Sequence, residues 1–138
     1  MRKIYEKINL YIYLFVPLSL ILVHHLLKIY FRMNLLNTNS FSDKSFEFVL
    51  TMLGVLLTIF GLMFTLPDNE YRKLMKKYNH DKIIFNTIFS GITSSLVFII
   101  LNFSEISTYG QEILFIIIFS EVTVSTWWIF RTLKAINS

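Results

Sequence analysis

The sequence predicts an all-α, polytopic membrane protein with four transmembrane helices. Hydrophobic residues make up 54% of its 138 positions and charged residues only 16%, whereas a soluble domain has about 25% charged residues. The charges lie in short clusters between four long apolar runs. None of these runs alternates apolar and polar residues as a transmembrane β-strand does. Because a backbone inside a bilayer has to form its hydrogen bonds within its own segment, each run is expected to be a helix.

The four runs make the chain a single four-helix transmembrane domain, residues 1–138. A bilayer core about 30 Å thick needs roughly 20 apolar residues per helix. Spans are therefore expected at about residues 8–30, 46–66, 83–104 and 112–132. The remaining tails and connections are too short for an independent catalytic domain. The first run is longer than the apolar part of a signal peptide, about 7–15 residues, so we expect it to remain as a span.

The first span contains a proline and two adjacent histidines. Pro17 removes one helical hydrogen bond and crowds the carbonyl group of Tyr13, which predicts a kink. His24 and His25 lie in the outer half of the span, about 10 Å from its outer end. Ionisable side chains inside a span usually have a function, so both histidines are candidate intramembrane polar residues.

The second span presents a face of small residues. Glycine and threonine recur at intervals of four, three and four, which places them on one side of a helix. Small residues at this spacing allow two helix backbones to approach closely. The partner could be another helix of the chain or a second copy, and the pattern does not choose between them. The residues of this predicted packing face are Gly54, Thr58, Gly61 and Thr65.

The connection between the second and third spans predicts a short amphipathic helix. Pro67 suits the first position of a helix, and Asp68 and Glu70 suit its positive N-terminal end. Apolar and basic residues then take opposite sides. We expect this helix to lie on the cytoplasmic leaflet in contact with anionic lipid headgroups; docking of a soluble partner is the alternative. The basic residues are Arg72, Lys73, Lys76 and Lys77.

The third span repeats the small-residue pattern with Thr87, Gly91 and Ser94. We expect this face to support tight helix packing rather than to line a polar pore, because small-residue interfaces are common between transmembrane helices.

The fourth span carries an acid, Glu121, about 13 Å from its outer end and near the middle of the bilayer. An acid at this depth costs about 2.5–3.5 kcal/mol on insertion scales, so it is expected to face the bundle interior, a water-filled cavity or a partner. His24 and His25 are candidate partners because their depth is within about one helical turn of Glu121. The alternative is a neutral histidine that is bonded to a backbone carbonyl or to a neighbouring hydroxyl group.

The distribution of Lys and Arg predicts that both termini are cytoplasmic. Ten of these residues lie in the two tails and in the connection between the second and third spans, and three lie on the opposite side: Lys28, Arg32 and Lys44. Loops rich in Lys and Arg stay in the cytoplasm. This orientation also accounts for the net charge of +4, so direct binding of nucleic acid is not expected.

No catalytic, cofactor-binding or metal-binding residue is expected. The chain has no cysteine, and its three histidines lack the spacing of a structural metal site. It also has no glycine-rich phosphate loop. We therefore expect neither a cofactor nor enzymatic activity.

Three classes of function remain. The first is a sensor or scaffold subunit that reports a membrane disturbance to a soluble cytoplasmic partner. The second is an oligomeric, holin-like pore or ion channel that depolarises the membrane, with Glu121 in its lining. The third is a small proton-coupled exporter. It is disfavoured because multidrug exporters of this size carry their acid in the first span, whereas here the acid is in the last.

The layout of the chain resembles small bacterial membrane proteins of anti-phage defence systems, in particular the membrane subunits of the Kiwa system. In residues the likeness covers about Leu53 to Tyr78, where Gly54, Gly61 and the run Leu66–Pro67–Asp68 lead into the basic helix. The resemblance implies a homo-oligomer of the bacterial inner membrane that senses phage action at the envelope and works with a soluble, DNA-binding partner. It implies no catalytic residue, and it makes the basic helix the candidate contact surface for that partner.

Overall fold

The computed structural model describes residues 9–30, 38–65, 70–77, 79–104 and 108–136, and these segments are almost entirely helical. The helices are α2 (Ile12–Tyr30), α3 (Thr38–Thr65), α4 (Glu70–Lys77), α5 (His80–Phe103) and α6 (Thr108–Ile136). Pro67, Asp68 and Tyr78 lie outside the described residues. The prediction of an all-α protein is confirmed.

Four of the helices are long and apolar enough to cross a membrane, as the sequence predicts. Their candidate spans are Ile12–Tyr30, Lys44–Thr65, His80–Phe103 and Tyr109–Arg131. Helices α3, α5 and α6 begin before the expected apolar runs. Polar residues outside the hydrocarbon region can continue a helix because its backbone hydrogen bonds are internal. Four such helices indicate a membrane protein.

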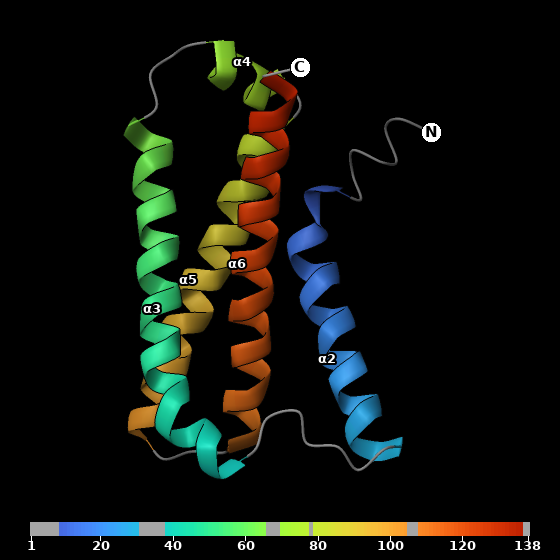
Figure 1. Cartoon of the computed structure of the whole chain (residues 1–138), viewed down its shortest axis with the longest axis vertical. Coiled ribbons are helices and arrows are strands. Elements are labelled where there is room, and N and C mark those ends of the chain that lie inside the picture. Colours follow the sequence, from blue (N-terminus) through green and yellow to red (C-terminus); the bar gives the residue numbers. More distant parts are fainter. Residues whose placement is uncertain (1–8, 31–37, 66–69, 78, 105–107, 137–138) are drawn as a thin grey trace.

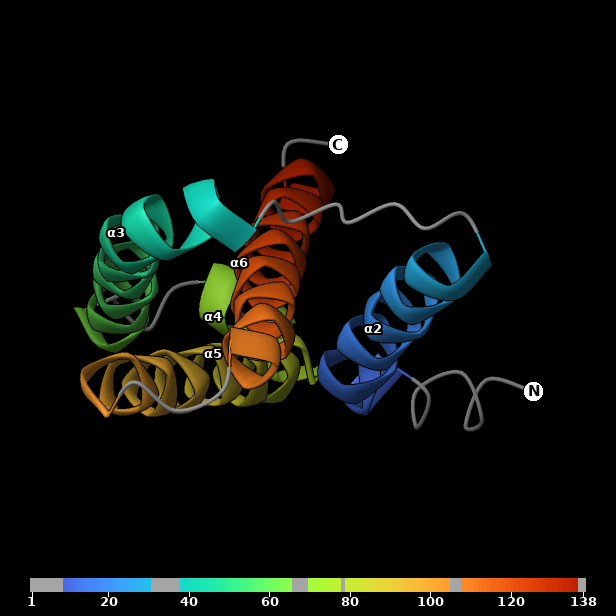
Figure 2. The same cartoon turned by 90° about the horizontal axis from the view of Figure 1, so that it is seen from below.

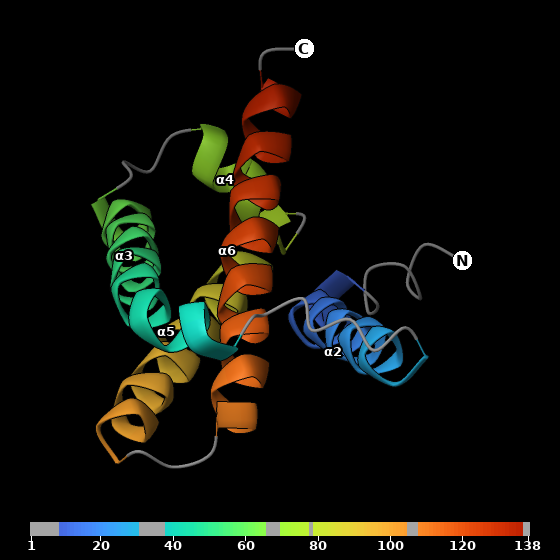
Figure 3. The same cartoon turned by 60° about the horizontal axis from the view of Figure 1, so that its bottom comes forward.

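The long helices run alternately up and down along one axis (Figure 1). Helix α4 lies at the end of the bundle where α6 finishes, and the described start of α2 is directed toward the same end. Seen along this axis, α6 stands between α3 and α5 on one side and α2 on the other (Figure 2). The tilted view of Figure 3 shows α5 crossing α6, while α2 stands apart from α3.

The core lies between α3, α5 and α6. One buried cluster is near the α4 end, and a smaller one at the opposite end contains Val49, Phe98 and Ile118. The first cluster contains residues from four helices, namely Leu56, Met75, Ile83, Ile84, Ile88, Val124 and Trp128. These side chains bury one face of α5 and of α6, and these two helices have the most buried spans of the four.

Helices α2 and α3 are the least enclosed of the long helices. Only 11% of the α2 span is buried inside the protein, against 39% for the span in α5. Helix α2 continues through Pro17 as a single helix, and Pro17 and His24 are its buried residues. Large apolar side chains cover its exposed sides, including Leu14, Phe15, Leu18, Leu22, Leu26 and Ile29. In a membrane these side chains face lipid, so α2 contacts the rest of the bundle along one narrow side.

Candidate functional site

Glu121 is fully enclosed by protein. Its side chain has an exposed fraction of 0%, and it projects from α6 toward α5 at Gly91. A methyl group added at Gly91 would lie 3.2 Å from Cβ of Glu121 and 2.7 Å from Cδ1 of Leu56 on α3. The missing side chain of Gly91 therefore lets α3 and α6 both approach α5 at the level of the acid. This is the bundle interior, one of the three environments that the sequence left open for Glu121.

The carboxyl group of Glu121 forms no hydrogen bond with the described residues. The hydroxyl group of Ser90 on α5 is near it but outside hydrogen-bonding geometry. Two other hydroxyl groups near this level are bonded to carbonyl oxygens of their own helices. Ser125 donates to Val122 at 3.0 Å, and Ser95 donates to Gly91 at 2.8 Å. The backbone thus competes for the donors that could satisfy the acid, and Glu121 is left as a buried polar group.

The predicted packing face of the third span divides between buried and half-buried positions. Thr87 and Gly91 are buried, Ser94 is half-buried, and the Thr87 hydroxyl donates to the carbonyl of Ile83 at 2.7 Å. Of Gly54, Gly61 and Gly91, only Gly91 lies in close contact with neighbouring helices, since nothing lies within 4 Å of a methyl group added at Gly54 or Gly61.

The predicted packing face of the second span points away from the described part of the protein. Its four residues, Gly54, Thr58, Gly61 and Thr65, are all exposed. The hydroxyl groups of Thr58 and Thr65 donate to backbone carbonyls of α3, at 2.8 Å and 3.1 Å. Each threonine is therefore satisfied inside its own helix. The face can lie against lipid or against a second copy without an unpaired hydroxyl group.

A second polar group joins α2 to α6 at the end opposite α4. Lys28 Nζ donates a hydrogen bond of 3.3 Å to Oε2 of Glu112, and Nε2 of His24 lies 3.6 Å from the same oxygen. The Glu112 side chain is 3% exposed and that of His24 is 5% exposed, but that of Lys28 is 36% exposed. We refer to His24, Lys28 and Glu112 as the outer cluster, since they lie at the end of the bundle away from α4. Its buried acid is compensated by a lysine that still reaches the surroundings.

Two contacts of Tyr109 extend the outer cluster, one with Lys28 and one with His25. The ammonium group of Lys28 lies 5.1 Å from the ring centre of Tyr109, a cation–π distance. The hydroxyl group of Tyr109 is 3.4 Å from Nδ1 of His25, and both side chains are exposed. These contacts also connect α2 with α6, so the two predicted histidines both belong to the same junction.

The structure pairs His24 with Glu112, not with Glu121. The two acids are nine residues apart on α6, which is about 13 Å along the helix, so a side chain in contact with Glu112 cannot also contact Glu121. Depth matching predicted the histidines within about one turn of Glu121, whereas the structure puts His24 at the level of Glu112. Glu112 was missed because it stands at the boundary of the apolar run, where an acid looks interfacial. Its helix-end position opposite Lys28 was the available signal.

The four predicted basic residues all lie on α4, but in different surroundings. Arg72 is half-buried, and Lys73, Lys76 and Lys77 are exposed. Met75 of the same helix is 3% exposed and joins the buried cluster that contains Trp128 of α6. The ring centres of His80 and Trp128 are 4.7 Å apart, and the guanidinium carbon of Arg131 lies 5.2 Å from the centre of the Trp128 ring. Helix α4 thus packs mainly against α5, and Met75 links it to the buried cluster that contains Trp128 of α6.

Comparisons of the chain with models of protein families, with curated proteins and with solved structures gave no match, so the function of these groups has to be inferred from their geometry.

Proposed function

We propose that this protein is an oligomeric, membrane-embedded sensor subunit of a bacterial anti-phage defence system. In this proposal it resides in the inner membrane with both termini in the cytoplasm. It responds to a disturbance of the bilayer and signals through α4 to a soluble cytoplasmic partner. The resemblance of residues Leu53 to Tyr78 to defence proteins gives the biological context, and the arrangement of α2, α6 and α4 supports the mechanism.

The observation that carries the proposal is the position of α6 between the other two elements. It is one continuous helix of 29 residues. Near its start, Glu112 holds α2 through the outer cluster, and toward its end, Trp128 belongs to the same buried cluster as Met75 of α4. A helix transmits displacement along its axis because its backbone is rigid. A shift of α2 would therefore reach α4 through α6.

Helix α2 is suited to detect changes in the bilayer. Its 19 residues span about 28 Å at 1.5 Å per residue, close to the thickness of a typical hydrocarbon core of about 30 Å. A thinner or thicker bilayer acts on such a helix by changing its tilt. The few buried residues of α2 offer little resistance, so the charged contacts of Glu112 set the force that the membrane has to overcome.

The test is a distance measurement between α2 and α6 in bilayers of different thickness. Because the chain has no cysteine, spin labels can be confined to Leu22→Cys and Phe119→Cys, both exposed positions, and dilution with unlabelled protein isolates the distance within one protomer. We expect the distance distribution to shift between lipids with long and short acyl chains, and Glu112→Gln to broaden it in both. A matched label pair on the central helices, Phe89→Cys and Phe119→Cys, should stay constant. An α2–α6 distance that is insensitive to thickness would overturn the sensor mechanism.

An oligomeric pore is the second candidate, and the exposed small-residue face of α3 favours it because that face suits association of copies. Glu121 does not support a role in the pore lining, since it is enclosed by α3, α5 and α6 within one protomer. Ion flux into liposomes separates the two functions. A pore lined by Glu121 would conduct and would change its ion selectivity in Glu121→Gln, whereas a sensor gives no flux in either form.

A further inference from the structure

A cavity of about 310 Å³ opens at the α4 end of the bundle, between α3, α4 and α5. It belongs neither to the outer cluster nor to the surroundings of Glu121. Part of its wall is apolar and comes from Met63 and Phe64 in the last turn of the α3 span and from Phe85 of α5. These residues lie at the boundary between the membrane-spanning part of the chain and the connection that contains α4.

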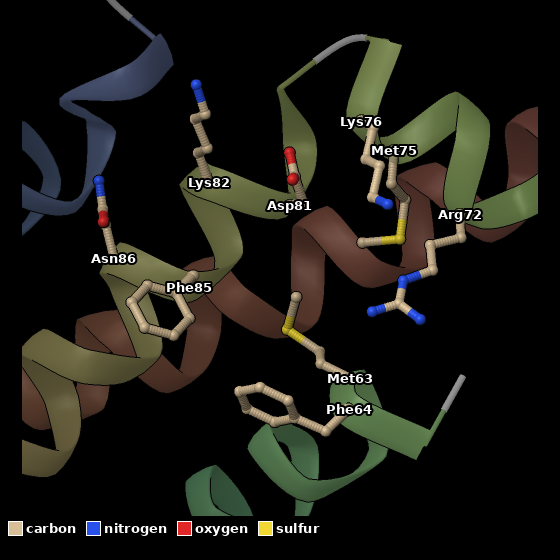
Figure 4. Close-up of a pocket in the computed structure, with 9 residues that line it drawn as sticks. All are labelled: Met63, Phe64, Arg72, Met75, Lys76, Asp81, Lys82, Phe85 and Asn86. Atoms are coloured by element: carbon tan, nitrogen blue, oxygen red, sulfur yellow. The ribbon is translucent and has the colours of Figure 1, made fainter. Parts of the chain in front are cut away.

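The opposite part of the wall is charged. Arg72 and Lys76 of α4 and Lys82 of α5 contribute three cations, and Asp81 contributes one carboxylate. The lining therefore has a net charge of +2. In Figure 4 the charged ends of Arg72 and Lys76 extend from α4 toward the space above Met63 and Phe64, while the ammonium group of Lys82 points away from them. Arg72 and Lys76 each also take part in a further interaction within the protein.

We propose that this cavity binds one anionic phospholipid of the membrane leaflet on the α4 side. Arg72 and Lys76 would hold the phosphate group, and an acyl chain would lie over Met63, Phe64 and Phe85. Basic pockets between transmembrane helices are suited to anionic headgroups. Here the cations and the apolar wall occur in the order in which a headgroup and its chain occur in a bilayer, from the end of the bundle toward its middle.

Two features favour a lipid over a free anion such as inorganic phosphate or a nucleotide. The methionine and phenylalanine side chains offer van der Waals contact to an acyl chain, and an inorganic anion cannot use such an apolar surface. In addition, the carboxylate of Asp81 in the same wall opposes a group with several negative charges. A phosphodiester with a single negative charge fits a lining of net charge +2 better than a polyphosphate does.

The cavity separates the basic residues of α4 into two pairs. Arg72 and Lys76 line it, whereas Lys73 and Lys77 are exposed and lie outside its lining. This division supplies a matched control, because each pair carries two positive charges on the same helix. The lipid proposal requires a membrane location but not the sensor role, so the two can fail separately.

The experiment measures lipid binding to the full chain in detergent by native mass spectrometry, with phosphatidylglycerol and phosphatidylcholine as probes. We expect one phosphatidylglycerol to remain bound per protomer and to be preferred over phosphatidylcholine by at least tenfold. Arg72→Gln with Lys76→Gln should reduce this preference by at least tenfold. Lys73→Gln with Lys77→Gln should leave it unchanged, and helix content by circular dichroism confirms that both variants fold.

One further variant and two competitors complete the test. Met63→Trp fills part of the cavity at its apolar wall and leaves the charge of the lining unchanged. We expect it to weaken phosphatidylglycerol binding, as the changes at Arg72 and Lys76 do. Full displacement of the lipid by millimolar inorganic phosphate or ATP would identify the site as one for a free anion and would overturn the proposal. Equal losses in the two charge-pair variants would also overturn it, because they would indicate attraction to the whole helix instead of binding in the cavity.

Discussion

At the scale of single residues, the informative feature is the difference between glycines that share the same sequence pattern. Gly91 and Gly61 both occur in small-residue faces of transmembrane helices. A side chain at Gly91 would meet Leu56 and Glu121, whereas one at Gly61 would meet nothing within 4 Å. The end of the Leu56 side chain can move aside at low cost. Cβ of Glu121 cannot, because it is attached directly to the backbone of α6.

The substitution Gly91→Ala should therefore destabilise the protomer. We expect α5 and α6 to separate at this level, at a cost of about 1–3 kcal/mol, typical of overpacking a tight core. Gly61→Ala is the matched control. It should be neutral or stabilising by up to about 1 kcal/mol, because the unfolded chain has less conformational freedom to lose at alanine than at glycine. Unfolding in mixed detergent micelles measures both changes. A Gly91→Ala protein as stable as Gly61→Ala would show that the helices do not meet there.

At the scale of elements, the attachment of α2 depends on charges that are unequally buried. The side chain of Glu112 is 3% exposed and that of Lys28 is 36% exposed. Removing one member of an ion pair is costly when the remaining charge stays buried. Lys28, once alone, can extend toward water or headgroups, but Glu112 would remain enclosed with His24 beside it.

Lys28→Met should thus destabilise the junction of α2 and α6 more than Glu112→Gln does, by about 1 kcal/mol or more. The double variant should recover part of the loss, since it leaves no charge without its partner. The distance distribution between labels at positions 22 and 119 reports the junction directly, and unfolding in micelles reports its energy. If Glu112→Gln were the more damaging change, the assignment of the buried charge would be wrong.

At the scale of the whole molecule, the exposed small-residue face of α3 remains without a neighbour in the described part of the chain. Gly54, Thr58, Gly61 and Thr65 lie on this outer face. Helices associate in lipid through close backbone contact at such residues, because lipid provides no hydrophobic drive. We propose this face as the interface between copies.

Gly54→Leu with Gly61→Leu should reduce the oligomer to smaller species while leaving the protomer folded, because neither position contacts the protein interior. Val55→Leu adds bulk at an exposed position about 100° away on the same helix and should not change the assembly. Counting of photobleaching steps in liposomes measures the number of copies. Assembly that is unaffected by the two leucines would place the interface elsewhere, for example on the exposed side of α2.

The sequence by itself determined the fold class and the positions of the four long helices. This was possible because the lengths of apolar runs and the need for internal backbone hydrogen bonds are local properties. It also identified Glu121 and the basic residues of α4 as unusual. Only the tertiary structure decided that His24 contacts Glu112, that Gly91 is enclosed while Gly61 is exposed, and that Arg72 and Lys76 line a cavity that Lys73 and Lys77 do not reach. These outcomes depend on how each helix is rotated and shifted against its neighbours. Side chains far apart in the chain set that rotation and shift by packing together, so the periodicity within one segment cannot reveal them.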